Sequence, residues 1–244
     1  MIFHAPQKVL EPSDCPTLKI NNVTLSRATE FNFLGTLISD TLSWKPHISA
    51  LCKKLSRTIG IMRRLKNTLP SRILLSIYNS IFLSYIHQSV LVWGHNPGRV
   101  FKLQKKAIRL VFKTKYNAHT DNLFKVNCIP KFPDIYKIAA LKFYHKYCNN
   151  KTPTYFQGIF SPLYGPHSHN TRNNPPRPQV SKKTYTSKCI RYIIPKIVSI
   201  TPSNITDKFK SHSLEGFGYY VKRFCCDQYN DVCNIINCYI CGNG

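Results

Sequence analysis

Acidic residues are scarce in this sequence, and their scarcity limits the chemistry that the chain can perform. Of 244 residues only 10 are Asp or Glu, against 35 Lys or Arg. Polymerases and many nucleases need two or three carboxylates that converge on divalent metal ions. Here only Asp227 and Asp231 stand at the four-residue spacing of one helix face. Gly-rich phosphate loops and a nucleophile elbow are also missing. We therefore expect neither catalysis by this chain alone nor a cofactor in it.

Neither a targeting segment nor a membrane-spanning segment is expected. The apolar run in "MIFHAPQKVLEPSD" is too short for a signal peptide. Residues 73–92 carry no charge and have the length of a membrane helix, but Ser76, Ser80 and Ser84 interrupt them at helical spacing. A helix buried in protein is the better interpretation. Without a signal peptide, the 10 cysteines indicate a reduced intracellular protein of the nucleus and cytoplasm.

Positive charge is what the sequence has in excess. The formal net charge is +25 and the pI is about 9.8. So large an excess repels itself unless a polyanion is nearby. The basic residues are spread over many segments and do not cluster beside one apolar span, which disfavours an acidic membrane surface. Nucleic acid is therefore the expected partner, and a membrane is not.

The hydrophobic pattern predicts an α+β fold that is mainly α. "TLKINNVTLS" is typical of two short strands joined at Asn21 and Asn22, and "FNFLGTLIS" of a third strand. From Ser43 the period becomes helical. The predicted organisation is a small N-terminal β-hairpin or sheet (1–42), a helical bundle (43–149), a proline-rich irregular arm (150–204) and a cysteine-rich tail of uncertain order (205–244).

Two of the predicted helices have an apolar face and a basic face. The first begins near Ser43, and its apolar residues recur at steps of three or four: Ile48, Leu51, Leu55, Ile59 and Met62. Its opposite face carries Lys53, Arg57 and Arg64. The second lies in "GRVFKLQKKAIRLVFKTK", and its basic face carries Lys102, Lys105, Lys106, Arg109 and Lys113. Further helices are predicted over 71–93, 121–126 and 134–147. Basic side chains on one helix face can track phosphates without reading bases.

The last residues contain the one pattern suggestive of a metal. Cys238 and Cys241 form a C-x-x-C pair, which suits zinc, and Cys226 and Cys233 are the other candidate ligands. The spacing from Cys226 to Cys233 is too wide for the usual knuckle. A disordered tail of free thiols is the alternative.

Several segments together resemble one protein family. These are "FNFLGTLISDTLSWKPHI", "RTIGIMRRLKNTLPSRILLSIYNSIFLSYIHQSVLVWG", "LQKKAIRLVF" and "HSHNTRNNPPRPQVSKKTYTSKCIRYIIPKI". In order and spacing they are similar to the region that follows the catalytic palm in reverse transcriptases of jockey-like LINE retrotransposons, which lack long terminal repeats. The resemblance covers roughly residues 1–204.

The resemblance implies a role in gripping nucleic acid. Phe33, Leu34 and Gly35 match the strand at the end of the palm, near the primer terminus. Residues 43–149 match the helical thumb, and Arg172 belongs to a Thr-Arg pair of the C-terminal arm. The implied partners are an RNA template, a DNA primer and the upstream palm and fingers of a parent polyprotein.

The same resemblance implies that polymerisation belongs to the parent RNA-directed DNA polymerase, which uses Mg²⁺. Its metal-binding Tyr-x-Asp-Asp motif precedes the matched region, so Met1 is expected to be an internal methionine. This sequence departs from the family at "VSITPSN", where the family usually has Trp-Asn-x-Leu-Pro. Two alternatives stay open: an independent host RNA- or DNA-binding protein, and a helical module that packs against a partner protein.

Overall fold

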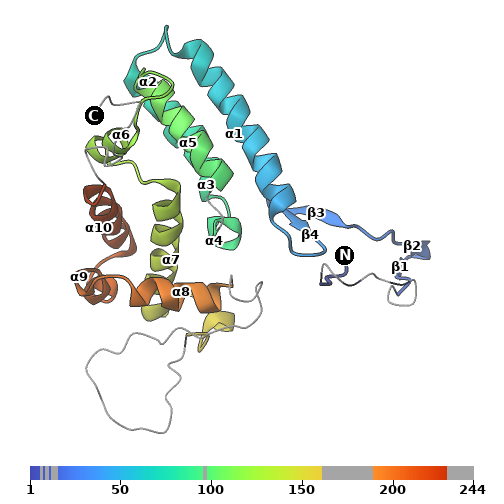
Figure 1. The fold of residues 1–244 in the computed structure, drawn as a ribbon. Coiled ribbons are helices and arrows are strands. Elements are labelled where there is room, and N and C mark those ends of the chain that lie inside the picture. The colour runs from blue at the N-terminus through green and yellow to red at the C-terminus, as the bar shows by residue number, and fades with distance from the viewer. Residues whose placement is uncertain (6–7, 9–10, 12–15, 96–97, 161–188, 230–244) are drawn as a thin grey trace, which may run out of the picture.

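The computed structural model describes residues 1–5, 8, 11, 16–95, 98–160 and 189–229. Two small antiparallel hairpins come first, and helices follow to the end of the described part (Figure 1). This confirms the predicted α+β, mainly α, fold. No helix in these ranges is long and apolar enough to cross a membrane.

The first hairpin lies where the sequence predicted it. Strand β1 (Lys19–Ile20) pairs with β2 (Val23–Thr24), so that Ile20 faces Val23. The turn residues Asn21 and Asn22 have φ of +48° and +63°. A two-residue hairpin turn of type I′ needs positive φ at both positions, which asparagine tolerates better than most residues.

The predicted third strand is wrong, because the segment folds back on itself. Strand β3 (Glu30–Phe33) ends before Leu34, and β4 (Thr36–Ser39) returns antiparallel to it. Leu34 and Gly35 make the turn, with φ of +48° and +80°. The backbone angle favours glycine at position 35, and a Cβ there would also lie 2.2 Å from Nε2 of Gln88, so that this side chain would have to move.

Three long helical segments and one short helix form the bundle that follows. Their elements are α1 (Lys45–Leu65), then α2 (Ser71–Ile77), the π-helical turn η2 (Tyr78–Phe82) and α3 (Leu83–His87) as one rod, then the short α4 (Val90–Trp93), and α5 (Gly98–Val111). Pro46 occupies the first turn of α1, where a missing N–H costs nothing. Helix α5 packs against both α1 and α2.

The π turn explains how the uncharged rod is buried. Leu74, Tyr78, Phe82 and Ile86 are fully buried and stand four residues apart. In a regular α-helix of 3.6 residues per turn, such a series drifts by about 40° per step. The wider π turn reduces the rotation per residue and keeps the series on one face. The expectation of a buried helix therefore holds for one face of the rod, and the other face is exposed.

The C-terminal part is more helical than the sequence predicted. It contains α6 (Asp121–Val126), α7 (Phe132–Cys148), the 3₁₀ turn η3 (Thr154–Phe156), α8 (Ile190–Ser199), α9 (Ser203–Thr206), the 3₁₀ turn η5 (Asp207–Phe209) and α10 (Leu214–Asp227). Helices α6 and α7 were expected. Helices α8 and α9 replace part of the predicted irregular arm, and α10 replaces part of the predicted tail. Burial of Ile194 and Val198 in the core beside α7 stabilises α8 despite Pro195 within it.

Two hydrophobic cores share α7. The first takes its residues mainly from α1 to α6 and the start of α7, with Cys226 from α10. It contains Trp93, whose ring stacks on Phe132 of α7 with centroids 5.6 Å apart. The second surrounds Phe217 of α10 and takes Ala140 and Leu141 from the other half of α7. The helices of both cores are thus held on a common element.

Candidate nucleic-acid interface

The part of the helical bundle from α1 to α5 carries cations and no acids. Between Asp40 and Asp121 the sequence has fifteen lysines and arginines and not one Asp or Glu. The two flanking carboxylates are already paired, Asp40 with Arg27 at 3.1 Å and Asp121 with Lys131 at 2.8 Å. Within the described ranges, no lysine or arginine of α1 or α5 is paired with a carboxylate. The positive potential of this surface is therefore not offset locally.

Helix α1 presents its three predicted cations on one exposed face. Lys53, Arg57 and Arg64 are exposed, and the buried Leu55 lies on the other side of the helix. Gly60 stands between Arg57 and Arg64 on this face, and no atom lies within 4 Å of the position that its Cβ would occupy. The face is therefore open at this point, between its cations.

Helix α5 presents fewer free cations than the sequence predicted. Lys102, Lys106 and Lys113 are exposed. Lys105 is half-buried, and its Nζ lies 4.6 Å from the centroid of the Phe101 ring. It keeps its charge but is held on the protein by this cation–π contact.

Arg109 has a structural contact that the sequence did not predict. Its guanidinium is half-buried, and Nε donates a hydrogen bond to the carbonyl of Ala118 at 2.7 Å. Burial lowers the pKa of Arg109 from its ordinary value. This hydrogen bond holds the segment that follows α5 against the helix.

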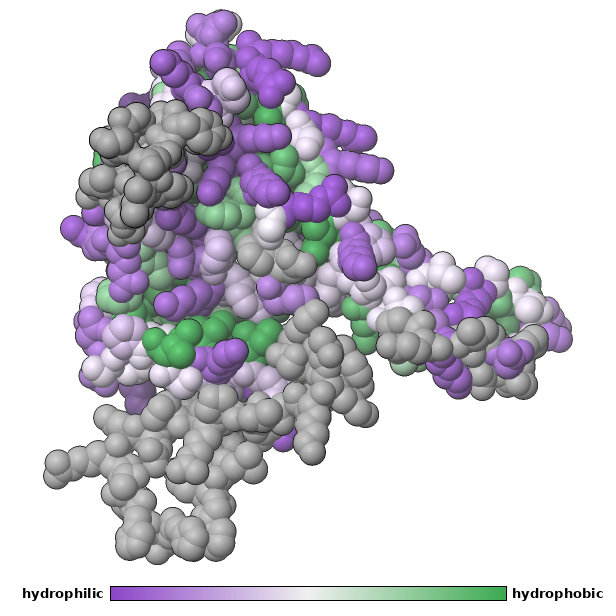
Figure 2. Space-filling model, in the orientation of Figure 1, coloured by the Kyte–Doolittle hydropathy of each residue, from purple (hydrophilic) through white to green (hydrophobic). Residues whose placement is uncertain are grey.

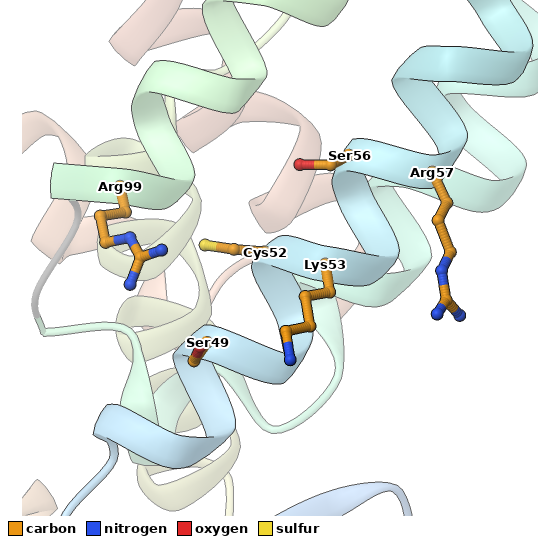
Figure 3. Close-up of a pocket in the computed structure, with 6 residues that line it drawn as sticks. All are labelled: Ser49, Cys52, Lys53, Ser56, Arg57 and Arg99. Atoms are coloured by element: carbon orange, nitrogen blue, oxygen red, sulfur yellow. The ribbon is translucent and has the colours of Figure 1, made fainter.

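A pocket of about 340 Å³ lies between α1 and the first turn of α5 (Figure 3). Its lining residues are Ser49, Cys52, Lys53, Ser56, Arg57 and Arg99. Arg99 and Cys52 point toward one another across the gap, whereas Lys53 and Arg57 extend along the outer side of α1. Burial raises the pKa of the Cys52 thiol, and the charge of Arg99 opposes that rise.

Three cations and two hydroxyl groups around one open pocket suit an oxyanion such as a phosphate. Arg99 was not among the predicted site residues. The signal was available, because at 100° per residue Arg99 falls on the same side of α5 as Lys106.

The predicted primer-end residues form the tip of the second hairpin. Phe33 and Leu34 are 56% and 79% exposed. The hairpin joins the base of α1, where the backbone N–H of Leu37 donates to Nδ1 of His47 at 3.2 Å. Burial and the charge of Lys54 lower the pKa of His47. The neighbour of Gly35 in the structure is Gln88, whose amide donates to the carbonyl of Leu34.

Most of the remaining predicted site residues lie outside the described part. These are Arg172 and three of the candidate zinc ligands, Cys233, Cys238 and Cys241. Cys226 is buried in α10, where burial and the neighbouring Cys128 raise its pKa to about 12. Among the described residues no three His, Cys, Asp or Glu side chains are placed to hold a metal ion.

Figure 2 shows hydrophilic side chains gathered over the upper part of the molecule, where Figure 1 places α1 and α5.

Comparison of the chain with protein-family models, with curated proteins and with solved structures finds no match. The candidate interface is therefore defined by its own geometry and charge.

Proposed function

We propose that the chain binds the phosphate backbone of nucleic acid through the exposed cations of α1 and α5. The observation that carries this proposal is the acid-free bundle, in which both basic helix faces border one cationic pocket. Ordinary protein surfaces mix both charge signs. A surface whose charges all have one sign repels itself. Binding to nucleic acid stabilises it, because its Lys and Arg replace the counterions condensed on the phosphates.

We further propose that the nucleic acid is the RNA template and DNA primer of a retrotransposon reverse transcriptase. The resemblance to the thumb and palm-end region of jockey-like LINE enzymes supports this. In that assignment the bundle is the thumb, and the β3–β4 hairpin lies where the thumb meets the palm. The parent enzyme would supply the aspartates and Mg²⁺, since this sequence has no Tyr-x-Asp-Asp motif. This chain grips the duplex and does not polymerise.

The exposed β3 hairpin supports a protein partner on the palm side. Phe31, Phe33 and Leu34 are each more than half exposed, and β3 pairs only with β4 among the described strands. Apolar groups on an open strand edge are a liability for a protein that acts alone. An upstream palm and fingers would cover them in the parent polyprotein.

Binding measured at rising salt tests the proposal. The ligand is an RNA–DNA hybrid with a recessed primer, and the readout is fluorescence anisotropy. We expect affinity to fall steeply between about 50 and 200 mM salt. The triple variant Lys53→Ala, Arg57→Ala and Arg64→Ala should bind more weakly to all sequences alike, with a salt slope shallower by about three, or one for each lost phosphate contact.

A charge-matched variant is the control. Arg191, Lys196 and Lys210 are exposed cations of the C-terminal helices and their connections. Their replacement by Ala removes the same net charge but should leave the slope nearly unchanged. Equal effects of the two triple variants would reduce the binding to non-specific attraction by net charge. Salt-insensitive binding, or none, would favour the protein-interaction module.

A further inference from the structure

The connection between α5 and α6, residues 112–120, holds an exposed aromatic ring between two lysines. Tyr116 is 90% exposed, more than any other large hydrophobic side chain in the described ranges. Lys113 and Lys115 are exposed beside it. Tyrosine is usually partly buried, because its ring is largely apolar. Here the ring makes no aromatic or cation–π contact within the described chain.

The start of this connection is fixed by hydrogen bonds. The N–H of Thr114 donates to the carbonyl of Arg109 at 3.0 Å, and the N–H of Lys113 donates to that of Leu110 at 3.2 Å. These two bonds form a Schellman motif, which ends a helix with one residue in the left-handed conformation. Lys113 has that conformation, with φ of +54°.

The tip of the connection is fixed as well. The N–H of Ala118 donates to the carbonyl of Lys115 at 3.1 Å, and this turn contains Tyr116. The carbonyl of Ala118 accepts the bond from Arg109 Nε at 2.7 Å. The ring is therefore displayed from a backbone that is tied to α5 on both sides.

Resting on the nucleic-acid binding proposed above, we propose that Tyr116 stacks on one unpaired nucleobase while Lys113 and Lys115 bind the adjacent phosphates. Every base has a π face, so stacking of this kind does not depend on sequence. A tyrosine has only two side-chain torsions and loses little entropy when it is covered. A backbone already in place lowers the cost further.

Charge favours a nucleic acid over a protein partner at this ring. The exposed lysines lead along α5 from Lys102 and Lys106 to Lys113, just beyond its end. The nearest carboxylate in sequence, Asp121, is paired with Lys131 at 2.8 Å. In a duplex each base is covered by its neighbours in the stack, so a free face belongs to an overhang or a single strand. The site therefore selects the unpaired part of a template.

Affinity measurements on matched ligands test the proposal in the full chain. The ligands are a single strand of about 16 nucleotides and a blunt duplex of the same length. Tyr116→Ala should weaken binding of the single strand by about 5- to 150-fold and leave the duplex unchanged. Tyr116→Phe keeps the ring and should bind within about twofold of wild type. The control is Tyr155→Ala, because Tyr155 is 87% exposed but lies on η3, without an adjacent lysine.

Photo-crosslinking supplies a readout that does not depend on affinity. A single strand carrying 5-iodouracil should crosslink to the peptide that contains Tyr116, as identified by mass spectrometry. The proposal is overturned if wild type binds single strands in a salt-dependent manner and Tyr116→Ala binds equally well, or if the crosslink maps elsewhere. If wild type binds neither ligand, the nucleic-acid binding itself fails, and the stacking site fails with it.

Discussion

Replacing Lys113 with Gly should stabilise the fold and weaken nucleic-acid binding at the same time. Lys113 has φ of +54° at the end of α5, and its side chain is exposed. The left-handed conformation costs a residue with a Cβ about 1–2 kcal/mol, and glycine avoids this cost. Glycine loses about 0.5–1 kcal/mol more than other residues through chain entropy on folding. The net gain is about 0.5–1 kcal/mol.

The stability gain is measurable as a rise in Tm. For a chain of this size 1 kcal/mol corresponds to about 2–4 °C, so we expect a rise of about 1–4 °C by calorimetry. Lys113→Ala removes the same charge without relieving the backbone, and it should be less stable than Lys113→Gly by about 1 kcal/mol. Both variants should lose about 0.9 from the salt slope of binding. If Lys113→Ala proved as stable as Lys113→Gly, the left-handed geometry at this position would be refuted.

Three further predictions concern buried polar groups. Gln104→Leu should lower the free energy of unfolding in urea by about 3 kcal/mol. The fully buried side-chain amide of Gln104 forms hydrogen bonds with Tyr78, Pro130 and Phe132, and each group left without a partner costs about 1–3 kcal/mol. A loss below about 1 kcal/mol would contradict this. Arg109→Lys keeps the charge but loses the directed bond to Ala118; it should speed amide exchange in residues 113–118 and leave the salt slope unchanged, whereas a shallower slope would assign Arg109 to a phosphate. Stability should fall as pH drops below about 6.5, because the pKa of His47 is lowered in the folded chain and only the unfolded chain is protonated there. The loss is at most about 1.4 kcal/mol per pH unit. Thermal unfolding of His47→Gln should show a smaller pH dependence than wild type.

Helix α1 was predictable because its apolar residues follow the helical period without interruption. Leu51, Leu55 and Met62 were assigned to a buried stripe from spacing alone, and all three are buried in α1. In long amphipathic helices this spacing identifies the buried face. The cations on the other face follow by geometry, so the candidate interface on α1 was also accessible from the sequence.

The errors arose where one residue decides the local chain direction. In "FNFLGTLIS" the apolar alternation continues through Leu34, and leucine is an unusual residue for the left-handed turn that it makes. Residues 150–204 were predicted to form an irregular arm, although Ile190, Ile194 and Ile197 repeat at helical spacing around Pro195. Burial against α7 outweighed the hydrogen bond that proline removes.

The sequence did not predict which cations are exposed and which are bonded within the protein. Charge is visible in a sequence, but a carbonyl acceptor such as that of Ala118 exists only once the connection between α5 and α6 has closed. The sequence therefore treated Arg109 and Lys106 alike, although the first is bonded within the protein and the second is exposed. Tyr116 was missed for the same reason, since exposure depends on the path of the backbone.

The placement of α7 affects how this protein can be recombined. One end of the helix supplies Phe132 and Ile135 to the first core, and the other supplies Ala140 and Leu141 to the second. The change of composition indicates a boundary at residue 149. A junction there would leave α8 and α10 without α7, the helix that they pack against. A natural or engineered chimera that inherits either half must therefore inherit α7 with it, so the two halves are not separately exchangeable modules.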